Sequence, residues 1–305
     1  MNPIFLKPTL KTLIWGTEQW GISAHPNGDD EVLNEEYAGK TLSQLWAEKP
    51  ELFGFEGVAE DLNIRGIFPL LTKIIDANTD LSIQVHPDDE YAGKNENGSL
   101  GKTECWYIMD AKPGATIVIG HNAKNHDEVK SMIENGKWND FIRVIPVHKG
   151  DFFFIEPGTV HAIKGGTEIL ETQQSSDITY RVYDYDRLQD GKPRQLHVKQ
   201  SIDVIKAPFE DKNPPLRSEK QFKFDGVTSD SIKQLVSCDL FTVWHANLNG
   251  SLKLEQSMPF LLCSVIDGAC ELKGKKLKKG DHFILPSGYG TAEFTGNAEM
   301  IFSSL

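Results

Sequence analysis

Cysteine is scarce in this 305-residue chain, and its distribution argues against two kinds of structure. No two cysteines have the CxxC spacing of a zinc knuckle or a redox pair, and their density is far below that of a domain held together by disulfides. We therefore expect reduced core residues without a catalytic role at all four positions, Cys105, Cys238, Cys263 and Cys270.

Long hydrophobic runs and excess positive charge are also missing. No stretch approaches the roughly 20 consecutive apolar residues of a membrane span, and the first residues lack the apolar core of a signal peptide, so we expect a cytoplasmic protein. The formal net charge is −12, which argues against nucleic acid or a membrane as partner, because either would require a basic contact surface. A small anionic substrate remains compatible if a few local Lys or Arg side chains hold it.

The pattern that is present is that of β-sheet. Short runs of β-branched and aromatic residues are separated by Gly, Pro and Asn turns, as at residues 81–85, 116–119, 151–155 and 282–285. Helical spacing is confined to one segment that opens at Thr41 with the form of a capping box and to a second from Asp127 to Asn135. Strands and helices do not alternate regularly, so we predict a mainly all-β fold with a few helical insertions in the N-terminal half.

One segment of the chain has the composition of a linker. Residues 207–218 are rich in proline and charge and have no hydrophobic periodicity. We therefore predict two domains, residues 1–210 and residues 211–305.

A sequence pattern on one side of this boundary is repeated on the other side. Residues 150–161 contain a Gly-Asp turn, an apolar strand and a Pro-Gly turn that leads to His161, and residues 280–291 repeat the pattern with Thr291 at the last position. Two unrelated strands with similar turns would also produce such a match. The pattern resembles the second motif of the cupin family, which implies two jelly-roll barrels, the second of them without a metal site.

Four side chains of ligand type occur in or beside these strands. Side chains along a strand alternate between its two faces, so Gln84 and His86 lie on the same face if the strand at residues 81–85 continues by one residue. Glu104 opens another apolar strand, and His161 follows the cupin-like turn. Buried polar groups need either hydrogen-bond partners or a metal; for the metal, two imidazoles, a carboxylate and an amide oxygen suit zinc or another divalent first-row ion.

Longer motifs occur at residues 68–77, 81–89, 18–25 (imperfectly) and 168–172 with Ser176, Asp177 and Arg181. Together they resemble the type I mannose-6-phosphate isomerases over most of residues 10–200. The resemblance implies an aldose-ketose isomerase of the cupin fold that interconverts mannose 6-phosphate and fructose 6-phosphate. It also implies one Zn²⁺ per chain, with Gln84, His86, Glu104 and His161 as ligands.

The same resemblance implies roles for five further residues. Arg181 corresponds to the active-site arginine and Lys102 to a substrate-contacting lysine, while Lys73 and Ser82 correspond to substrate-binding positions. Glu171 is our candidate acid/base, ahead of Glu168 because of its ten-residue separation from Arg181. Considered without the family, Arg181 would be expected to pair with a carboxylate such as Asp184 or Asp186.

Other functions remain open at this point. A metal-binding cupin that acts on another sugar, or a non-catalytic sugar-binding module, would share most of these features. A cupin dioxygenase would use the two histidines and Glu104 as an iron triad, but Gln84 would crowd the positions that oxygen needs. We expect a phosphosugar as the only partner apart from the protein itself, as a monomer or a homodimer.

Overall fold

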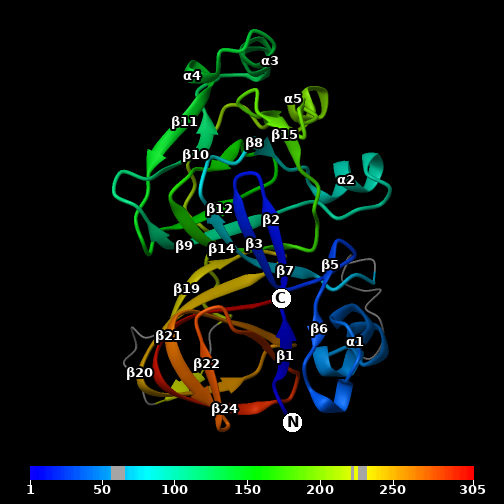
Figure 1. Ribbon diagram of the computed structural model, residues 1–305, viewed down its shortest axis with the longest axis vertical. Coiled ribbons are helices and arrows are strands. Elements are labelled where there is room, and N and C mark those ends of the chain that lie inside the picture. Colours follow the sequence, from blue (N-terminus) through cyan, green and yellow to red (C-terminus); the bar gives the residue numbers. More distant parts are fainter. Residues whose placement is uncertain (56–65, 221–222, 226–231) are drawn as a thin grey trace. The chain divides into compact units, whose positions relative to one another are not determined.

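Strands dominate the computed structural model, which describes residues 1–55, 66–220, 223–225 and 232–305 (Figure 1). Five α-helices interrupt them, all within residues 42–204 of the described chain, so the prediction of a mainly β fold with helical insertions toward the N-terminus is confirmed. In the described residues we find no helix with the length and apolarity that a membrane crossing requires. The chain forms two compact units.

The first unit contains residues 1–10, 19–74 and 214–305. Its centre is a sheet in which the long strands β20, β24 and β21 are neighbours, coloured orange to red in Figure 1. The N-terminal strand β1 extends this sheet by pairing with β23, with Ile4 opposite Ile284. The elements are β1 (Ile4–Lys7), β4 (Ala24–His25), β5 (Gly28–Asp29), β6 (Glu31–Val32), η1 (Glu35–Tyr37), α1 (Leu42–Glu48), η2 (Pro50–Phe53), β18 (Lys223–Asp225), β19 (Ile232–Ser237), β20 (Thr242–Gln256), β21 (Leu261–Leu272), β22 (Lys275–Lys278), β23 (His282–Leu285) and β24 (Gly290–Ser304).

The second unit contains residues 11–18 and 75–213. Strands β2 (Thr9–Leu13), β3 (Gly16–Ile22) and β7 (Leu70–Ala77) run from one unit into the other. The remaining elements are β8 (Ile83–Val85), α2 (Asp89–Asn95), β9 (Glu104–Ala111), β10 (Thr116–His121), α3 (His126–Glu134), α4 (Trp138–Phe141), β11 (Ile142–Pro146), β12 (Phe152–Ile155), β13 (His161–Ile163), β14 (Thr167–Gln174), β15 (Tyr180–Tyr183), β16 (Leu188–Gln189), β17 (Lys192–Pro193) and α5 (Val198–Val204).

The units divide the chain in a way that the linear pattern did not suggest. One boundary, between Asn213 and Pro214, falls inside the predicted linker. Residues 1–10 and 19–74 nevertheless group with the C-terminal part, because β1 continues the C-terminal sheet and Phe53 and Phe68 pack against Phe260. The assignment of a metal-binding role to residues 1–210 and a metal-free role to residues 211–305 stays a prediction.

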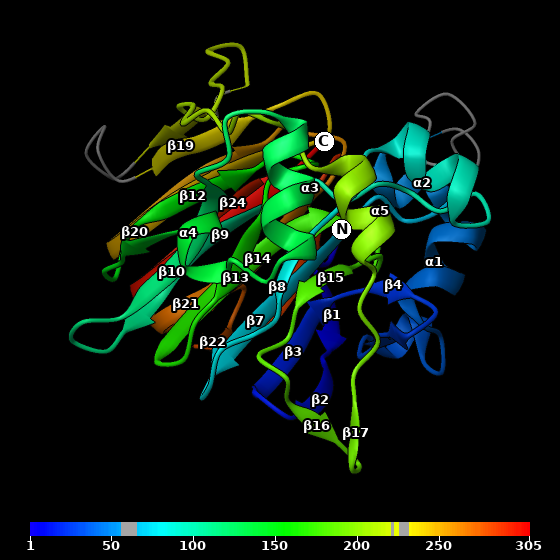
Figure 2. The same cartoon turned by 90° about the horizontal axis from the view of Figure 1, so that it is seen from above.

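Two sheets of the second unit enclose its core. The five-stranded sheet has the order β11-β10-β13-β8-β15, and the second sheet contains β12, β9 and β14 as neighbours. Alternation along the first sheet buries both of its faces. One face meets the second sheet in a cluster that includes Ile117, Ile163 and Trp106, while Ile83 and Val85 lie on the other face in a cluster with side chains of α3. Figure 2 shows α3 and α5 on the outer side of this sheet.

Local signals explain where the two predicted helices begin. The Thr41 N–H donates to Gln44 Oε1 at 3.0 Å, and α1 follows at Leu42. Asn125 caps α3 by accepting from the Glu128 N–H at 2.9 Å, and the helix begins at His126, one residue before the predicted start. The predicted strand at residues 81–85 is shorter than expected, since β8 begins at Ile83.

A buried carboxylate ties together the N-terminal strands of the first unit. Asp30 is fully buried and accepts hydrogen bonds from the Thr9 N–H and Oγ1–H, both at 3.0 Å, and from the Ser23 N–H at 2.9 Å. Burial raises the pKa of Asp30 from 3.8 to about 7, although these hydrogen bonds act in the opposite direction. At pH values between these two pKa values, Asp30 is therefore protonated in the folded protein and ionised in the unfolded chain.

This proton should make stability fall as pH rises. Below about pH 4 both states are protonated at Asp30, and above it the unfolded state gains stability by ionising, with a slope of at most about 1.4 kcal/mol per pH unit up to pH 7. Urea unfolding of the wild type and of Asp30→Asn between pH 4 and pH 7.5 isolates this contribution. The wild-type stability minus that of the variant should decline over the range; a difference that is constant or rises with pH would contradict the assignment.

Candidate metal and active site

Strand register in the five-stranded sheet gathers three of the predicted site residues. His161 on β13 and Arg181 on β15 both lie directly opposite Gln84 on β8. Directly opposed residues of neighbouring strands project from the same face of a sheet. His86 and Ser82 are each two residues from Gln84, and both are buried. The period of two inferred from the sequence therefore places this set on the inner face.

The second sheet supplies the acidic partners. Glu104 begins β9, as predicted, and Trp106 follows it on the same face. On the neighbouring strand β14, Glu171 lies opposite Trp106. Trp106 belongs to the core cluster between the sheets, so this face is also turned inward.

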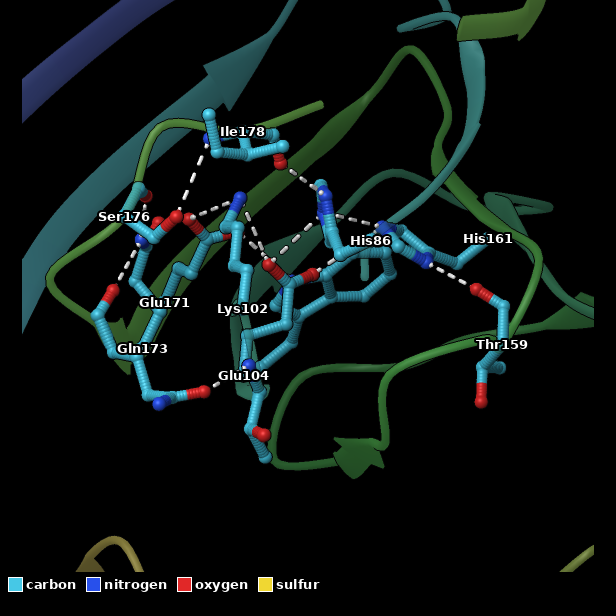
Figure 3. Close-up of polar contacts among 12 residues, drawn as sticks. His86, Lys102, Glu104, Thr159, His161, Glu171, Gln173, Ser176 and Ile178 are labelled. Carbon is cyan, nitrogen blue, oxygen red and sulfur yellow. Dashed lines mark hydrogen bonds and ion pairs between the residues drawn. The ribbon is translucent and has the colours of Figure 1, made fainter. Parts of the chain in front are cut away.

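His86, Glu104 and His161 meet at the centre of this core (Figure 3). The His86 and His161 Nε2 atoms are 3.1 Å apart, and each lies 3.4 Å from an oxygen of Glu104. All three side chains are at most 1% exposed. Among the described residues they form the group whose histidine and carboxylate donor atoms all lie within 4.8 Å of one another.

The outer nitrogens of the two imidazoles determine what their inner nitrogens can do. His86 Nδ1 lies 2.8 Å from the Ile178 carbonyl oxygen, and His161 Nδ1 lies 2.9 Å from the Thr159 carbonyl oxygen. A carbonyl oxygen only accepts, so both Nδ1 atoms carry the proton and both Nε2 atoms of the neutral rings present a lone pair. Two lone pairs and a carboxylate that face one another fit a cation, and carbonyl-oriented imidazoles are the usual arrangement around a protein-bound metal.

Burial and charge keep these donors in the state that a metal requires. Burial lowers the pKa of His86 to about 3, with a further contribution from the Lys102 cation, and burial also lowers the pKa of His161. Burial opposes ionisation of Glu104, but the Lys102 cation holds the pKa of this carboxyl well below its usual range. At neutral pH the cluster therefore consists of two neutral imidazoles and a carboxylate.

Lys102 links this cluster to the candidate acid/base. Its Nζ lies 3.0 Å from Glu104 Oε2 and 3.8 Å from Glu171 Oε1, and both it and Glu171 are buried. Burial opposes the charged form of Lys102, yet the two carboxylates raise its pKa above the ordinary value. The lysine is thus a permanent cation between the two carboxylates.

Trp106 is a member of the site that the sequence reasoning missed. Its Nε1–H donates to Glu171 Oε2 at 3.1 Å, and its ring lies edge-on to that of His161 with centroids 5.4 Å apart. The two-residue spacing from Glu104 was available as a signal, because it places an indole donor on the face of the ligand.

A second missed feature is the loop after β14. Gln173 Nε2 donates to the carbonyl oxygens of Gln174 and Ser176, and the Ser176 hydroxyl donates to the Leu100 carbonyl oxygen. These contacts hold the segment that leads to Ile178, whose carbonyl orients His86 (Figure 3). The loop reads as merely polar in the sequence, and no local pattern indicates that it orients a ligand.

Among the described residues, no carboxylate forms an ion pair with Arg181. Its backbone N–H donates to His197 Nδ1, whereas its half-buried side chain makes no hydrogen bond or ion pair with the described residues. Asp184 is already bound by Arg187 and Arg194, and Asp186 accepts from the Tyr183 hydroxyl. The pairing of Arg181 with Asp184 or Asp186, which we considered from the sequence, is absent among the described residues.

Two further predicted residues, Gln84 and Lys73, belong to different units. Gln84 is half-buried and faces the cluster by register, so its amide oxygen could join the donor set. Lys73 lies in the first unit, where it is buried with its Nζ 4.8 Å from the centre of the Trp20 ring. Its role in substrate binding stays a prediction.

Family models match two parts of the chain. The model described as phosphomannose isomerase type I, catalytic domain, matches residues 7–110, and the model described as mannose-6-phosphate isomerase, cupin domain, matches residues 231–305. The second match agrees with the cupin-like pattern that we inferred for residues 280–291.

Individual relatives cover the whole chain. Mannose-6-phosphate isomerase ManA of Bacillus subtilis is 45% identical over 100% of this chain and 99% of its own length, and mannose-6-phosphate isomerase of Streptococcus mutans is 44% identical over 99% and 98%. The crystal structure of mannose 6-phosphate isomerase from Bacillus subtilis superposes with a TM-score of 0.90 at 42% identity, covering 100% of both chains. These relatives confirm the resemblance seen in the sequence, and the chain therefore belongs to the type I mannose-6-phosphate isomerase family.

Proposed function

We propose that this protein interconverts mannose 6-phosphate and fructose 6-phosphate, with one zinc ion held by Gln84, His86, Glu104 and His161. The observation that carries the proposal is the pair of imidazole Nε2 atoms, 3.1 Å apart, with their lone pairs directed at each other and at Glu104. Family membership supplies the substrate and the reaction.

The chemistry of the donors favours zinc. Imidazole nitrogens and carboxylate oxygens are common zinc ligands, and a set of two imidazoles, one carboxylate and one amide leaves a net positive centre. When bound, zinc supplies a Lewis acid that polarises a substrate oxygen and stabilises negative charge on it. No thiolate lies in the cluster, since the buried cysteine nearest in sequence, Cys105, alternates to the opposite face of β9 from Glu104.

The remaining side chains account for proton transfer and charge. In the aldose-to-ketose direction, the Glu171 carboxylate accepts the proton from C2, which leaves an enediol(ate), and returns it to C1, while the proton of the C2 hydroxyl moves to the oxygen on C1. Lys102 stabilises the negative charge that develops on the substrate oxygens, and it also holds Glu171 by charge. Arg181, whose guanidinium is not committed to a carboxylate, binds an oxyanion of the intermediate or of the phosphate.

The proposal also covers substrate binding, cellular location and assembly. Ser82, buried two residues before Gln84, and Lys73 contact the sugar phosphate. A phosphorylated sugar as substrate and four cysteines without disulfides agree with a cytoplasmic enzyme. The assembly that we propose is a monomer or a homodimer.

Metal removal and reconstitution test the proposal directly. Protein stripped with a chelator should not convert mannose 6-phosphate to fructose 6-phosphate, and zinc should restore turnover. His86→Ala should stay inactive after zinc addition, because one of the converging lone pairs is lost. His148→Ala is the matched control and should behave like the wild type, since the His148 side chain is 80% exposed and is not one of the proposed ligands.

Two results would count against the isomerase. Folded, zinc-loaded wild type that gives no fructose 6-phosphate would remove the assignment, and binding of the sugar without turnover would favour a binding module. Full activity of His86→Ala would remove the metal site while leaving the reaction in place.

The role of Glu171 can be separated from that of its neighbour on the same strand. Glu171→Gln keeps the shape of the side chain and an acceptor for the Trp106 N–H, but it cannot take up a proton, so kcat should fall by about 10²- to 10⁴-fold. Zinc content and KM should change little. Glu168→Gln, three residues earlier on β14, should retain nearly full kcat; equal losses in the two variants, or none in Glu171→Gln, would exclude Glu171 as the base.

A further inference from the structure

A cluster of three arginines around one aspartate lies beside the proposed site. Asp184 is 4% exposed and lies three residues after Arg181 at the end of β15. Arg187 and Arg194 both bind its carboxylate, whereas the Arg181 side chain does not. Arg181 and Arg187 are each three residues from Asp184 in the sequence, yet only Arg187 binds its carboxylate.

Arg194 makes the most extensive contact with the Asp184 carboxylate. Its Nε lies 2.7 Å from Oδ2 and its Nη2 lies 2.5 Å from Oδ1, so its fork binds both carboxylate oxygens. Arg187 adds one contact from Nη2 to Oδ1 at 2.5 Å and donates its other groups to the backbone oxygens of Asp184 and Asp80. The Asp184 carboxylate thus accepts three hydrogen bonds from guanidinium groups, two on Oδ1 and one on Oδ2.

The backbone that delivers these arginines is held in an unusual conformation. Tyr185 and Asp186 have φ values of 57° and 55°, in the left-handed region that non-glycine residues rarely adopt. This turn brings Arg187 back onto Asp184, and the β16–β17 hairpin then returns the chain so that Arg194 reaches the same carboxylate. Two successive residues in this region are retained only where the surroundings require them.

Electrostatic coupling connects the cluster to Arg181. Burial lowers the pKa of Arg181, the nearby Arg194 cation lowers it further, and the carboxylates of Asp184 and Asp177 act in the opposite direction. Arg181 is therefore close enough to Asp184 to feel its charge. Because register places it opposite Gln84, its guanidinium is directed to the face on which the proposed metal ligands lie.

We propose that Arg194 is a positioning residue for the isomerase site, which occupies Asp184 and so keeps Arg181 unpaired for an oxyanion of the phosphosugar. The inference rests on the proposed function, since it assumes that Arg181 acts on the substrate. Arg194 itself does not touch the substrate. In the absence of Arg194, the Asp184 carboxylate forms an ion pair with Arg181. The guanidinium is then no longer available to an oxyanion of the substrate.

The decisive experiment is a rescue. Arg194→Gln should lower kcat/KM by about 10- to 100-fold, the range for one lost hydrogen bond between charged groups. Adding Asp184→Asn to this variant removes the competing carboxylate and should return kcat/KM to within about threefold of the wild type. A purely structural role of the ion pair would give no recovery, because the double variant lacks both partners.

Arg187→Gln is the matched control. Arg187 also binds Asp184, but its loss leaves the fork of Arg194 in place, so Arg181 should stay unpaired and kcat/KM should remain within about threefold of the wild type. The proposal is overturned if folded Arg194→Gln keeps wild-type kcat/KM or if the double variant is no better than the single one. If Arg194→Gln does not fold, the double variant decides, since the proposal requires it to be active.

A second readout does not depend on turnover. Phenylglyoxal labels guanidinium groups that are not held in ion pairs, and mass spectrometry of the labelled protein gives the rate at Arg181. This rate should fall in Arg194→Gln and recover in the double variant. Wild type that lacks isomerase activity but shows this labelling pattern would remove the proposed function and keep the arginine arrangement; an unchanged rate would remove the arrangement itself.

Discussion

The carboxylate of Glu104 is completely enclosed by protein, and a charge in such a place costs several kcal/mol unless cations surround it. Lys102 provides one positive charge at 3.0 Å, and the two imidazoles offer lone pairs that would repel the carboxylate unless a cation lies between them. The rest of the second unit is arranged around this requirement. One sheet carries His86 and His161, the other carries Glu104, and the outer nitrogens of both histidines are fixed by backbone carbonyls.

The same unit contains charged groups that pair with one another and, in the function that we propose, one that is left for the substrate. Asp184 forms ion pairs with two arginines. Glu171 accepts a hydrogen bond from the Trp106 indole and lies beside the Lys102 cation. Arg181 is left without an ion pair among the described residues and on the face of Gln84. In a protein with a formal net charge of −12, an anionic sugar phosphate is attracted only by such local cations, and their pairing state decides whether they are available.

Much of this was accessible from the sequence, because the relevant signals are local. The two-residue period placed Gln84 and His86 together, the apolar run after Glu104 predicted its strand, and the capping box predicted the start of α1 at Thr41. The contacts that orient these residues were not accessible, since they join positions distant in the chain. Trp106 reaches Glu171 only through the pairing of β9 with β14, and the grouping of residues 1–10 and 19–74 with the C-terminal sheet depends on pairings such as β1 with β23.

The central claim is that a cation occupies the space between the two imidazoles and Glu104, and X-ray absorption spectroscopy of the zinc-loaded protein at the zinc edge tests it most directly. Zinc bound there should have nitrogen and oxygen neighbours alone, at about 2.0–2.2 Å, with the longer-range scattering of two imidazoles. The His86→Ala variant should show the signature of fewer imidazoles or no bound zinc. Sulfur at about 2.3 Å, or wild-type protein that binds no zinc, would contradict the account.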